Sequence, residues 1–233
     1  MKNKNKNTLY CFSPPVMIAT MLIEVALAVF VFFKQKKSFL KNLTILTLVL
    51  LAVFQLAEFM VCQKYAGIST LLVSRLGFVA ITLLPPLGIH IANTIAGRKR
   101  NWSSIASYVL AAGFVGYFLV APGSINDSIC PGNYVIFRLG PSVSMAYGVY
   151  YFTLLACLLA LCIYLAIASK NKHHKQALVW LMIGALSFLV PTGIIYFIIA
   201  DSINALPSVM CGFAVILAII LATRVVPLAN TEK

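Results

Sequence analysis

Seven long apolar runs divide this sequence and limit the structures that it can form. They cover residues 10–33, 43–63, 70–95, 102–121, 144–168, 177–200 and 206–227. A helix that rises about 1.5 Å per residue needs about 20 apolar residues to cross the hydrocarbon core of a bilayer. The pattern therefore predicts an all-α integral membrane protein. We expect one seven-helix domain over residues 1–233, because no segment between the runs is long enough for a second domain.

The composition supports the same class and limits the partners. Charged residues make up 10% of the 233 positions, whereas a soluble domain carries about a quarter. Basic residues outnumber acidic ones by 18 to 5, but they fall in short clusters between the runs, as topology signals do. No nucleic-acid motif accompanies them, so we expect no nucleic-acid partner. The expected partners are membrane lipid, a small molecule or ion, and a second copy of the chain or a signalling protein.

The basic residues also predict an orientation. With the N-terminus outside, the inner segments hold 12 Lys and Arg and the outer segments hold 5, while Arg75 lies within the third run. Loops on the cytoplasmic side carry the excess of basic residues, so the N-terminus is predicted outside and the C-terminus in the cytoplasm. The basic tail at residues 1–7 opposes this assignment. We expect a multi-pass protein of a cell membrane, the inner membrane of a prokaryote.

Four cysteines from distant segments meet on the outer side under this orientation. Cys11 begins the first run, Cys62 ends the second, Cys130 lies in the 123–141 loop, and Cys211 lies one turn into the seventh run. The oxidising outer side permits disulfides, so we predict at least one among them. The favoured pair is Cys62 with Cys130, which would tie the long loop to a helix end. A redox-active or metal-binding thiol site and unpaired packing stay as alternatives, but no CxxC spacing supports a metal.

A polar stripe lies near the outer end of the second run. Gln55, Glu58 and Cys62 stand at positions i, i+3 and i+7, so they share one helix face. Ionisable groups in hydrocarbon are costly and usually face the bundle interior. Arg75 enters the next run at the same depth after a short loop. We predict that the stripe faces inward and that Glu58 pairs with Arg75, either as architecture or as part of a ligand site.

Two more ionisable groups lie deeper in the runs. Glu24 stands near the middle of the first run, and His90 follows the Pro85-Pro86 pair of the third run by one turn. The two prolines remove backbone donors, so they should kink or open the helix locally. For His90 three roles stay open: a hydrogen-bonded core residue, a proton or ligand contact, or a metal ligand.

The fifth run carries tyrosines in its outer part, and the sixth run is interrupted near its middle. Tyr147, Tyr150 and Tyr151 are typical of an interfacial aromatic belt. In the sixth run, Pro191 and the Thr-Gly pair that follows it interrupt the apolar pattern. The break at Pro191 lies deeper than the polar stripe, where freed backbone carbonyls could face a cavity.

The residues needed for several known membrane chemistries are missing. The seventh run has no lysine for a retinal Schiff base, and the runs hold a single histidine, too few for a His-rich zinc hydrolase. No GxSxG, HExxH or P-loop motif occurs. The sequence favours a non-enzymatic protein with no cofactor, catalytic residue or metal site.

Two short motifs, YCFSPP at residues 10–15 and FQLAE at residues 54–58, resemble those of an uncharacterised bacterial membrane family. Its members begin Met-Cys-Phe-Ser and carry Gln-Gln-x-x-Glu at the end of the second helix. The matching positions here are Cys11, Phe12, Ser13, Gln55 and Glu58. Phe54 replaces the first Gln, and ten residues precede the Cys. The resemblance covers about the first quarter of the chain and implies a multispanning membrane protein.

A looser resemblance concerns residues 75–100, RLGFVAITLLPPLGIHIANTIAGRKR. With seven runs around it, this segment resembles the seven-span sensor region in front of some bacterial histidine kinases, although no kinase domain follows here. The resemblance implies a sensor.

We therefore expect a sensor or receptor with an outward-facing polar pocket for a small ligand or ion. Its walls would be the ends of the first, second, third and seventh runs and the 123–141 loop. The predicted contacts are Gln55, Glu58, Arg75, Glu24 and His90. The alternative is a proton-coupled transporter or carrier in which the last four form a relay. A second alternative is a membrane thiol oxidoreductase that uses the outer cysteines.

Overall fold

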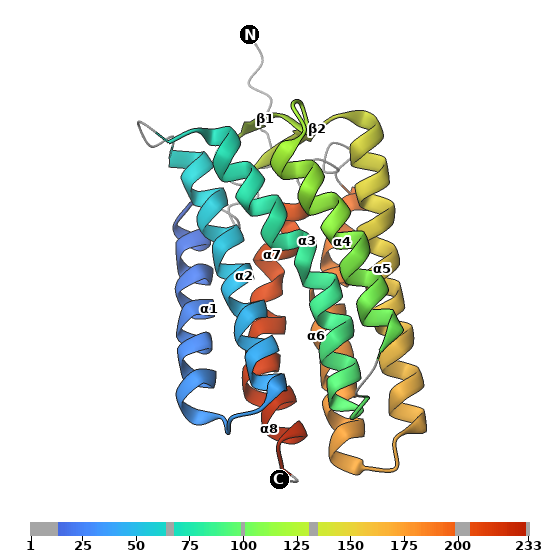
Figure 1. Ribbon diagram of the computed structural model, residues 1–233. Coiled ribbons are helices and arrows are strands. Elements are labelled where there is room, and N and C mark those ends of the chain that lie inside the picture. The colour runs from blue at the N-terminus through green and yellow to red at the C-terminus, as the bar shows by residue number, and fades with distance from the viewer. Residues whose placement is uncertain (1–13, 64–67, 99–100, 131–134, 199–205, 232–233) are drawn as a thin grey trace.

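Seven long helices pass side by side from one end of the protein to the other (Figure 1). The computed structural model describes residues 14–63, 68–98, 101–130, 135–198 and 206–231. The helices are α1 (Pro14–Lys34), α2 (Phe39–Gln63), α3 (Thr70–Ile95), α4 (Trp102–Val120), α5 (Pro141–Ala168), α6 (Lys172–Ile198) and α7 (Leu206–Ile220), followed by a π-helical turn (Leu221–Val225) and α8 (Val226–Ala229). All seven are long and apolar enough to cross a membrane, the last one counted through α8. The predicted seven-helix membrane protein is confirmed at this level.

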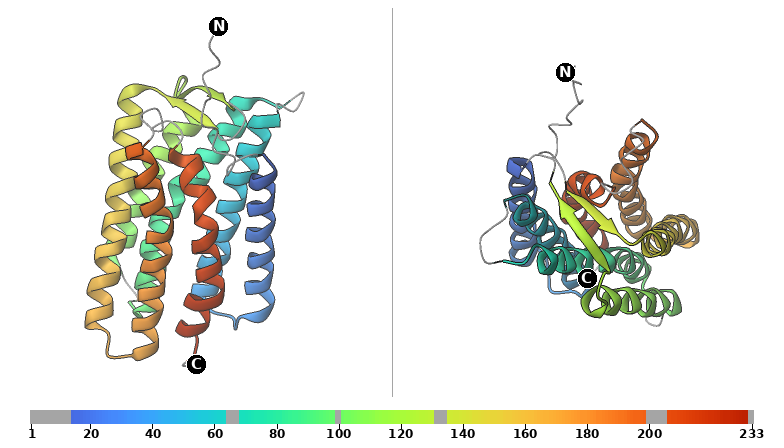
Figure 2. Two further views of the ribbon diagram at one scale, coloured as in Figure 1. Left: turned by 180° about the vertical axis from the view of Figure 1, so that it is seen from behind. Right: turned by 90° about the horizontal axis from the view of Figure 1, so that it is seen from above.

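The helices pack around α3 and α7. α3 contacts α2, α4, α5 and α6, and α7 contacts α1, α2 and α6. The most apolar stretch of α3 is 61% buried, whereas that of α4 is 22% buried. The view along the bundle shows α7 among the other helices, while α4 lies at the rim (Figure 2). The polar residues of α3 and α7 therefore lie in the interior of the bundle.

A β-hairpin covers one end of the bundle, which we call the hairpin end (Figure 2). β1 (Ile125–Ile129) pairs antiparallel with β2 (Ile136–Leu139), with Ile129 opposite Ile136. The side chains of Ile125, Val135 and Phe137 are buried against the helices. The sequence predicted only a long loop here, because short alternating strands are weak signals beside apolar runs.

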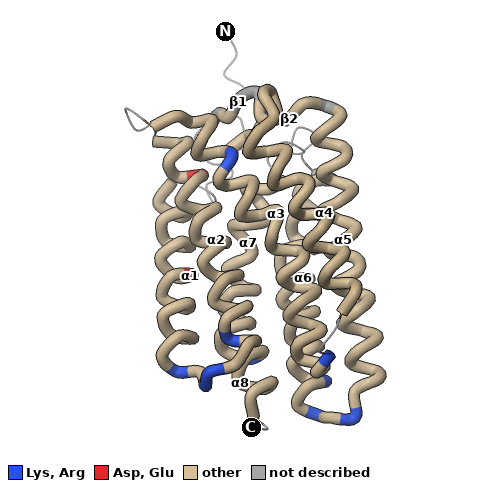
Figure 3. Tube along the Cα trace, in the orientation of Figure 1, with Lys and Arg blue, Asp and Glu red and all other residues tan. Residues whose placement is uncertain are grey.

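Basic residues gather at the opposite end, which we call the basic end (Figure 3). Lys41 also lies at this end, but its side chain is buried. Its ammonium group donates to the carbonyls of Phe32 (2.6 Å) and Gln35 (3.1 Å). These carbonyls belong to the C-terminal end of α1, where no helical donors follow. Lys41 therefore caps α1 and fixes the turn into α2.

Candidate functional site

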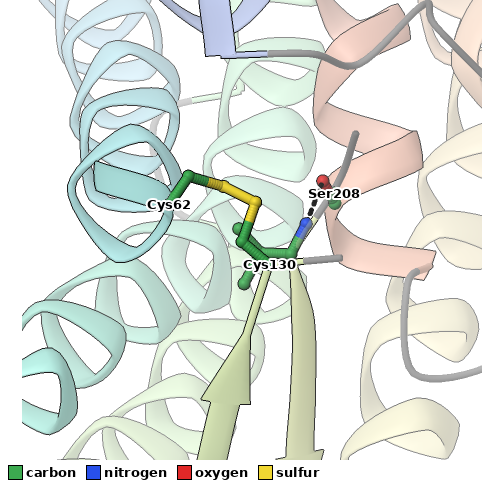
Figure 4. The surroundings of a disulfide bond; sticks show 4 residues. Cys62, Cys130 and Ser208 are labelled. Carbon is green, nitrogen blue, oxygen red and sulfur yellow. Dashed lines mark hydrogen bonds between the residues drawn. A yellow bond between two sulfur atoms is a disulfide. The ribbon is translucent and has the colours of Figure 1, made fainter. Parts of the chain in front are cut away.

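A disulfide ties the hairpin to α2 (Figure 4). It joins Cys62, at the end of α2, to Cys130, just after β1, with their Cα atoms 5.1 Å apart. The predicted pair is confirmed. Cys11 lies outside the described residues, and Cys211 is a buried free thiol, so the disulfide prediction is wrong for Cys211. The reason is its position on the inward face of α7, away from the hairpin strands.

Two hydrogen bonds tie the hairpin to other helices. The hydroxyls of Ser74 on α3 and Ser128 on β1 lie 2.8 Å apart. The backbone N–H of Val135 donates to the hydroxyl of Ser208 on α7 at 3.4 Å (Figure 4). The hairpin is thus fastened to α2, α3 and α7, and it covers the end at which the sequence predicted an open pocket.

An acid cluster lies below the hairpin, formed by Glu24, Gln55, Glu58 and Ser208 of α1, α2 and α7. The first three side chains are at most 1% exposed, so the inward orientation predicted for Gln55 and Glu58 is confirmed. α1 and α2 are antiparallel neighbours (Figure 3). Because Cα–Cβ bonds tilt toward a helix N-terminus, the two glutamates lean toward each other. Their carboxyl groups lie close enough for their charges to interact, and the Ser208 side chain lies beside Glu58.

Several polar atoms of the acid cluster lack a partner among the described residues. Both carboxyl oxygens of Glu24, Oε1 of Glu58 and Nε2 of Gln55 are buried there without a hydrogen bond. An isolated charge in such surroundings costs several kcal/mol. The cluster therefore has unused capacity for a proton or for a cationic ligand group.

The predicted pairing of Glu58 with Arg75 is wrong. The Arg75 guanidinium donates to the carbonyls of Leu119 and Ala121, both at 3.1 Å. These carbonyls stand at the C-terminal end of α4, where helical donors are missing. Arg75 thus faces α4, whereas Glu58 faces α7, and no ion pair joins them among the described residues.

His90 also faces α4 and not the acids. Its Nδ1 lies 3.2 Å from the hydroxyl of Tyr108, and its ring packs against that of Phe39. A neighbouring α3 residue, Asn93, donates to Ser103 and Ser104 of α4. This arrangement fits the interpretation of His90 as a hydrogen-bonded packing residue. In the described part of the chain, no three His, Cys, Asp or Glu side chains are placed to hold a metal ion.

A tyrosine cluster, formed by Thr82, Tyr147, Tyr150 and Tyr151, joins α3 to α5. Pro86 has no N–H, so the Thr82 carbonyl loses its helical donor. The Tyr150 hydroxyl donates to that carbonyl at 2.7 Å, and the Tyr147 hydroxyl lies 3.1 Å from Oγ1 of Thr82. The three tyrosines are buried. The predicted interfacial belt is therefore wrong, because the proline break supplies partners inside the bundle.

A large cavity, with a volume of about 890 Å³, lies beside the tyrosine cluster. Its walls come from α3, β2, α5, α6 and α7, and they include Phe137, Tyr151, Thr192 and Cys211. The sequence predicted walls from the ends of the first, second, third and seventh runs and the 123–141 loop, with contact to Gln55 or Glu58. α3, α7 and β2 do line this cavity, whereas α1, α2, Gln55 and Glu58 do not. The disulfide-bound hairpin and the close packing of α1, α2 and α7 fill that side, so space is left between α5 and α6.

Cys211 lies between the two regions. It lines the large cavity and also a deeper cavity of about 40 Å³, as do Tyr151 and Met210. It is also near enough to Glu58 and Glu24 for electrostatic interaction. Sequence reasoning placed Cys211 only among disulfide candidates. The spacing of Tyr147 and Tyr151, one helical turn apart, was the signal that could have identified the cavity wall.

The sequence matches no protein-family profile, and no curated protein is significantly similar to it. Function must therefore be argued from the site itself.

Proposed function

We propose that the protein is a membrane sensor or receptor that binds a small, mainly apolar molecule in the large cavity. The observation that carries the proposal is the cavity itself. Its volume of about 890 Å³ falls in the range of about 300–1,000 Å³ that small-molecule sites occupy, and its apolar walls with few polar groups are typical of them.

The mouth of the cavity favours a ligand that arrives from the bilayer. Met145 and Val149 line it and are 76% and 61% exposed. On a helix that crosses a membrane, such apolar side chains face lipid. A lipid-soluble molecule can enter between α5 and α6 without passing the hairpin.

One backbone acceptor favours a ligand with a hydroxyl or amide N–H. Ile81 lines the cavity, and the residue four positions later is Pro85. The Ile81 carbonyl has therefore lost its α-helical donor. A ligand with an apolar ring or chain and one hydrogen-bond donor matches these walls.

The proposal puts the hairpin end outside a prokaryotic inner membrane and the basic end in the cytoplasm. The excess of basic residues at one end and the disulfide at the other support this orientation. A signalling partner, or a second copy of the chain, would then meet the protein at its cytoplasmic end. The resemblance to seven-span sensor regions agrees with this arrangement.

Filling the cavity tests the proposal. Gly193 lines it, and a Cβ added there meets no atom within 4 Å, so Gly193→Leu adds a bulky side chain at an open position of the cavity wall. Gly113→Leu on α4 is the matched control, because Gly113 is exposed, equally open and outside the cavity. The probe is an apolar aryl diazirine that is photoactivated in vesicles and mapped by mass spectrometry.

We expect labelling of the Tyr151 and Cys211 peptides in the wild type and in Gly113→Leu, and a loss of most of it in Gly193→Leu. Equal labelling of all three proteins would contradict binding in the cavity. A screen of lipid-soluble compounds for a rise in the thermal midpoint, lost in Gly193→Leu, then identifies the ligand class.

A proton-coupled carrier is the second candidate, and the acid cluster favours it. Two buried glutamates that have no cationic partner in the described part of the chain can exchange a proton during transport. Arg75 and His90 are hydrogen-bonded to α4, so we do not include them in the proton relay. Uptake driven by a pH gradient and abolished in Glu58→Gln would support a carrier. A thiol oxidoreductase has less support, because Cys62 and Cys130 are already joined and serve to hold the hairpin.

A further inference from the structure

A groove at the basic end combines three cations with an indole ring. Its volume is about 580 Å³, and it is lined by Lys172, Lys175 and Trp180 of α6 and by Arg224 and Leu228 beyond α7. The three charged side chains are exposed. No acidic side chain is among the lining residues, so their charges are not neutralised within the groove.

The backbone places Arg224 in this groove. Residues 221–225 form a π-helical turn, which the Val226 N–H closes by donating to the Leu221 carbonyl. Such turns are rare and frequently lie at functional sites, because the wider turn redirects the side chains that it carries. The Arg224 guanidinium lies 5.5 Å from the centre of the Trp180 ring, over its face. The stacked guanidinium is thus held in place with its donors available.

The start of α6 adds to the positive potential. Lys172 and Lys175 stand in the first turn of this 27-residue helix, where the positive end of the helix dipole favours an anion. Asn171 caps the turn by accepting from the N–H groups of His173 and His174. The turn is therefore ordered.

We propose that this groove binds the phosphate group of an anionic phospholipid. The two lysines and Arg224 would hold the phosphodiester, and Trp180 and Leu228 would contact the glycerol and the first methylenes of the acyl chains. Basic pockets between helix ends on the cytoplasmic side bind such headgroups, and Trp is enriched at this depth of the membrane. The site is separate from the large cavity and does not depend on the sensor proposal.

Charge-neutral substitutions in the groove test this site. The double variant Lys175→Gln with Arg224→Gln removes two charges from it. The matched control, Lys34→Gln with Lys37→Gln, removes two exposed charges from the same end of the molecule. The full-length protein in detergent is titrated with short-chain phosphatidylglycerol, with phosphatidylcholine and with inorganic phosphate, and bound lipid is counted by native mass spectrometry.

We expect the groove variant to bind phosphatidylglycerol about 25-fold more weakly, since each of the two charges is worth about fivefold near an anionic surface. The control should change less than about twofold, and phosphatidylcholine should bind weakly to all three proteins. Equal losses in the two double variants would show general surface attraction and overturn the site. Inorganic phosphate that binds as tightly as the lipid would assign the groove to free phosphate and overturn the lipid assignment.

Discussion

The acid cluster and the tyrosine cluster are both buried near the hairpin end, but they differ in how far their buried polar groups are hydrogen-bonded. In the tyrosine cluster, Tyr150 donates to the carbonyl of Thr82 and Tyr147 bonds the Thr82 hydroxyl. In the acid cluster, two carboxyl oxygens of Glu24 and one of Glu58 have no hydrogen-bond partner among the residues that the structure describes. The first cluster uses its hydrogen-bonding capacity, and the second does not.

The difference comes from what a helical bundle can offer. A hydroxyl can donate, and Pro86 frees one carbonyl to accept from it. A carboxylate only accepts, and helical N–H groups are occupied by the helix itself. The tyrosine cluster is therefore suited to form a fixed cavity wall. The acid cluster, by contrast, retains a site for a proton or a cationic group.

The largest effect is expected from the disulfide, because the hairpin covers both clusters. In Cys62→Ser with Cys130→Ser, the covalent closure across 68 residues is lost. The free energy of unfolding should fall by about 4 kcal/mol, the value for loops of this length. Thermal unfolding measures the loss, and Cys157→Ser, which removes an exposed free thiol, is the control. Equal midpoints for the double variant and wild type would mean that noncovalent contacts alone hold the hairpin.

A smaller loss is expected in the tyrosine cluster. Tyr150→Phe keeps the ring and leaves the Thr82 carbonyl unpaired in the interior, so stability should drop by about 1–3 kcal/mol. Tyr164→Phe serves as the control, because Tyr164 is 59% exposed and only its ring contacts Arg98. If both variants have the same stability as the wild type, the Thr82 carbonyl has found another hydrogen-bond donor.

The smallest effect is expected in the acid cluster. Glu58→Gln keeps the shape and an acceptor for Ser208, so it should cost less than about 1 kcal/mol. Removing one member of a paired, buried ion pair costs about 3–5 kcal/mol instead. Chemical unfolding in mixed micelles separates these values. A loss of about 3–5 kcal/mol would show that Glu58 is an ionised, paired group. The acid cluster would then be as fully paired as the tyrosine cluster.

The sequence predicted the spans well because their signal is local. Each helix needs only its own run of apolar residues, and the seven runs match the seven helices. The Cys62–Cys130 pair was also predictable. The predicted topology places the end of the second helix and the long loop on the same side of the membrane, where few other cysteines lie.

The site was less predictable, because it depends on which faces of the helices meet. Arg75 and Glu58 enter the bundle at equal depth, but depth does not say that Arg75 turns toward α4. Gly193 and Thr192 line the cavity only because α5 and α6 leave space between them. Such gaps come from packing across the whole bundle and leave no pattern in any single run.

The position of α7 has a consequence for biosynthesis. Ser208 and Cys211 of this helix complete the acid cluster and a wall of the large cavity. The ribosome makes them after the other six long helices, when Cys62 and Cys130 have already been synthesised. Until α7 inserts, Glu58 lacks the neighbouring Ser208 side chain and the cavity lacks one side. Assembly of both regions therefore waits for a single late insertion step.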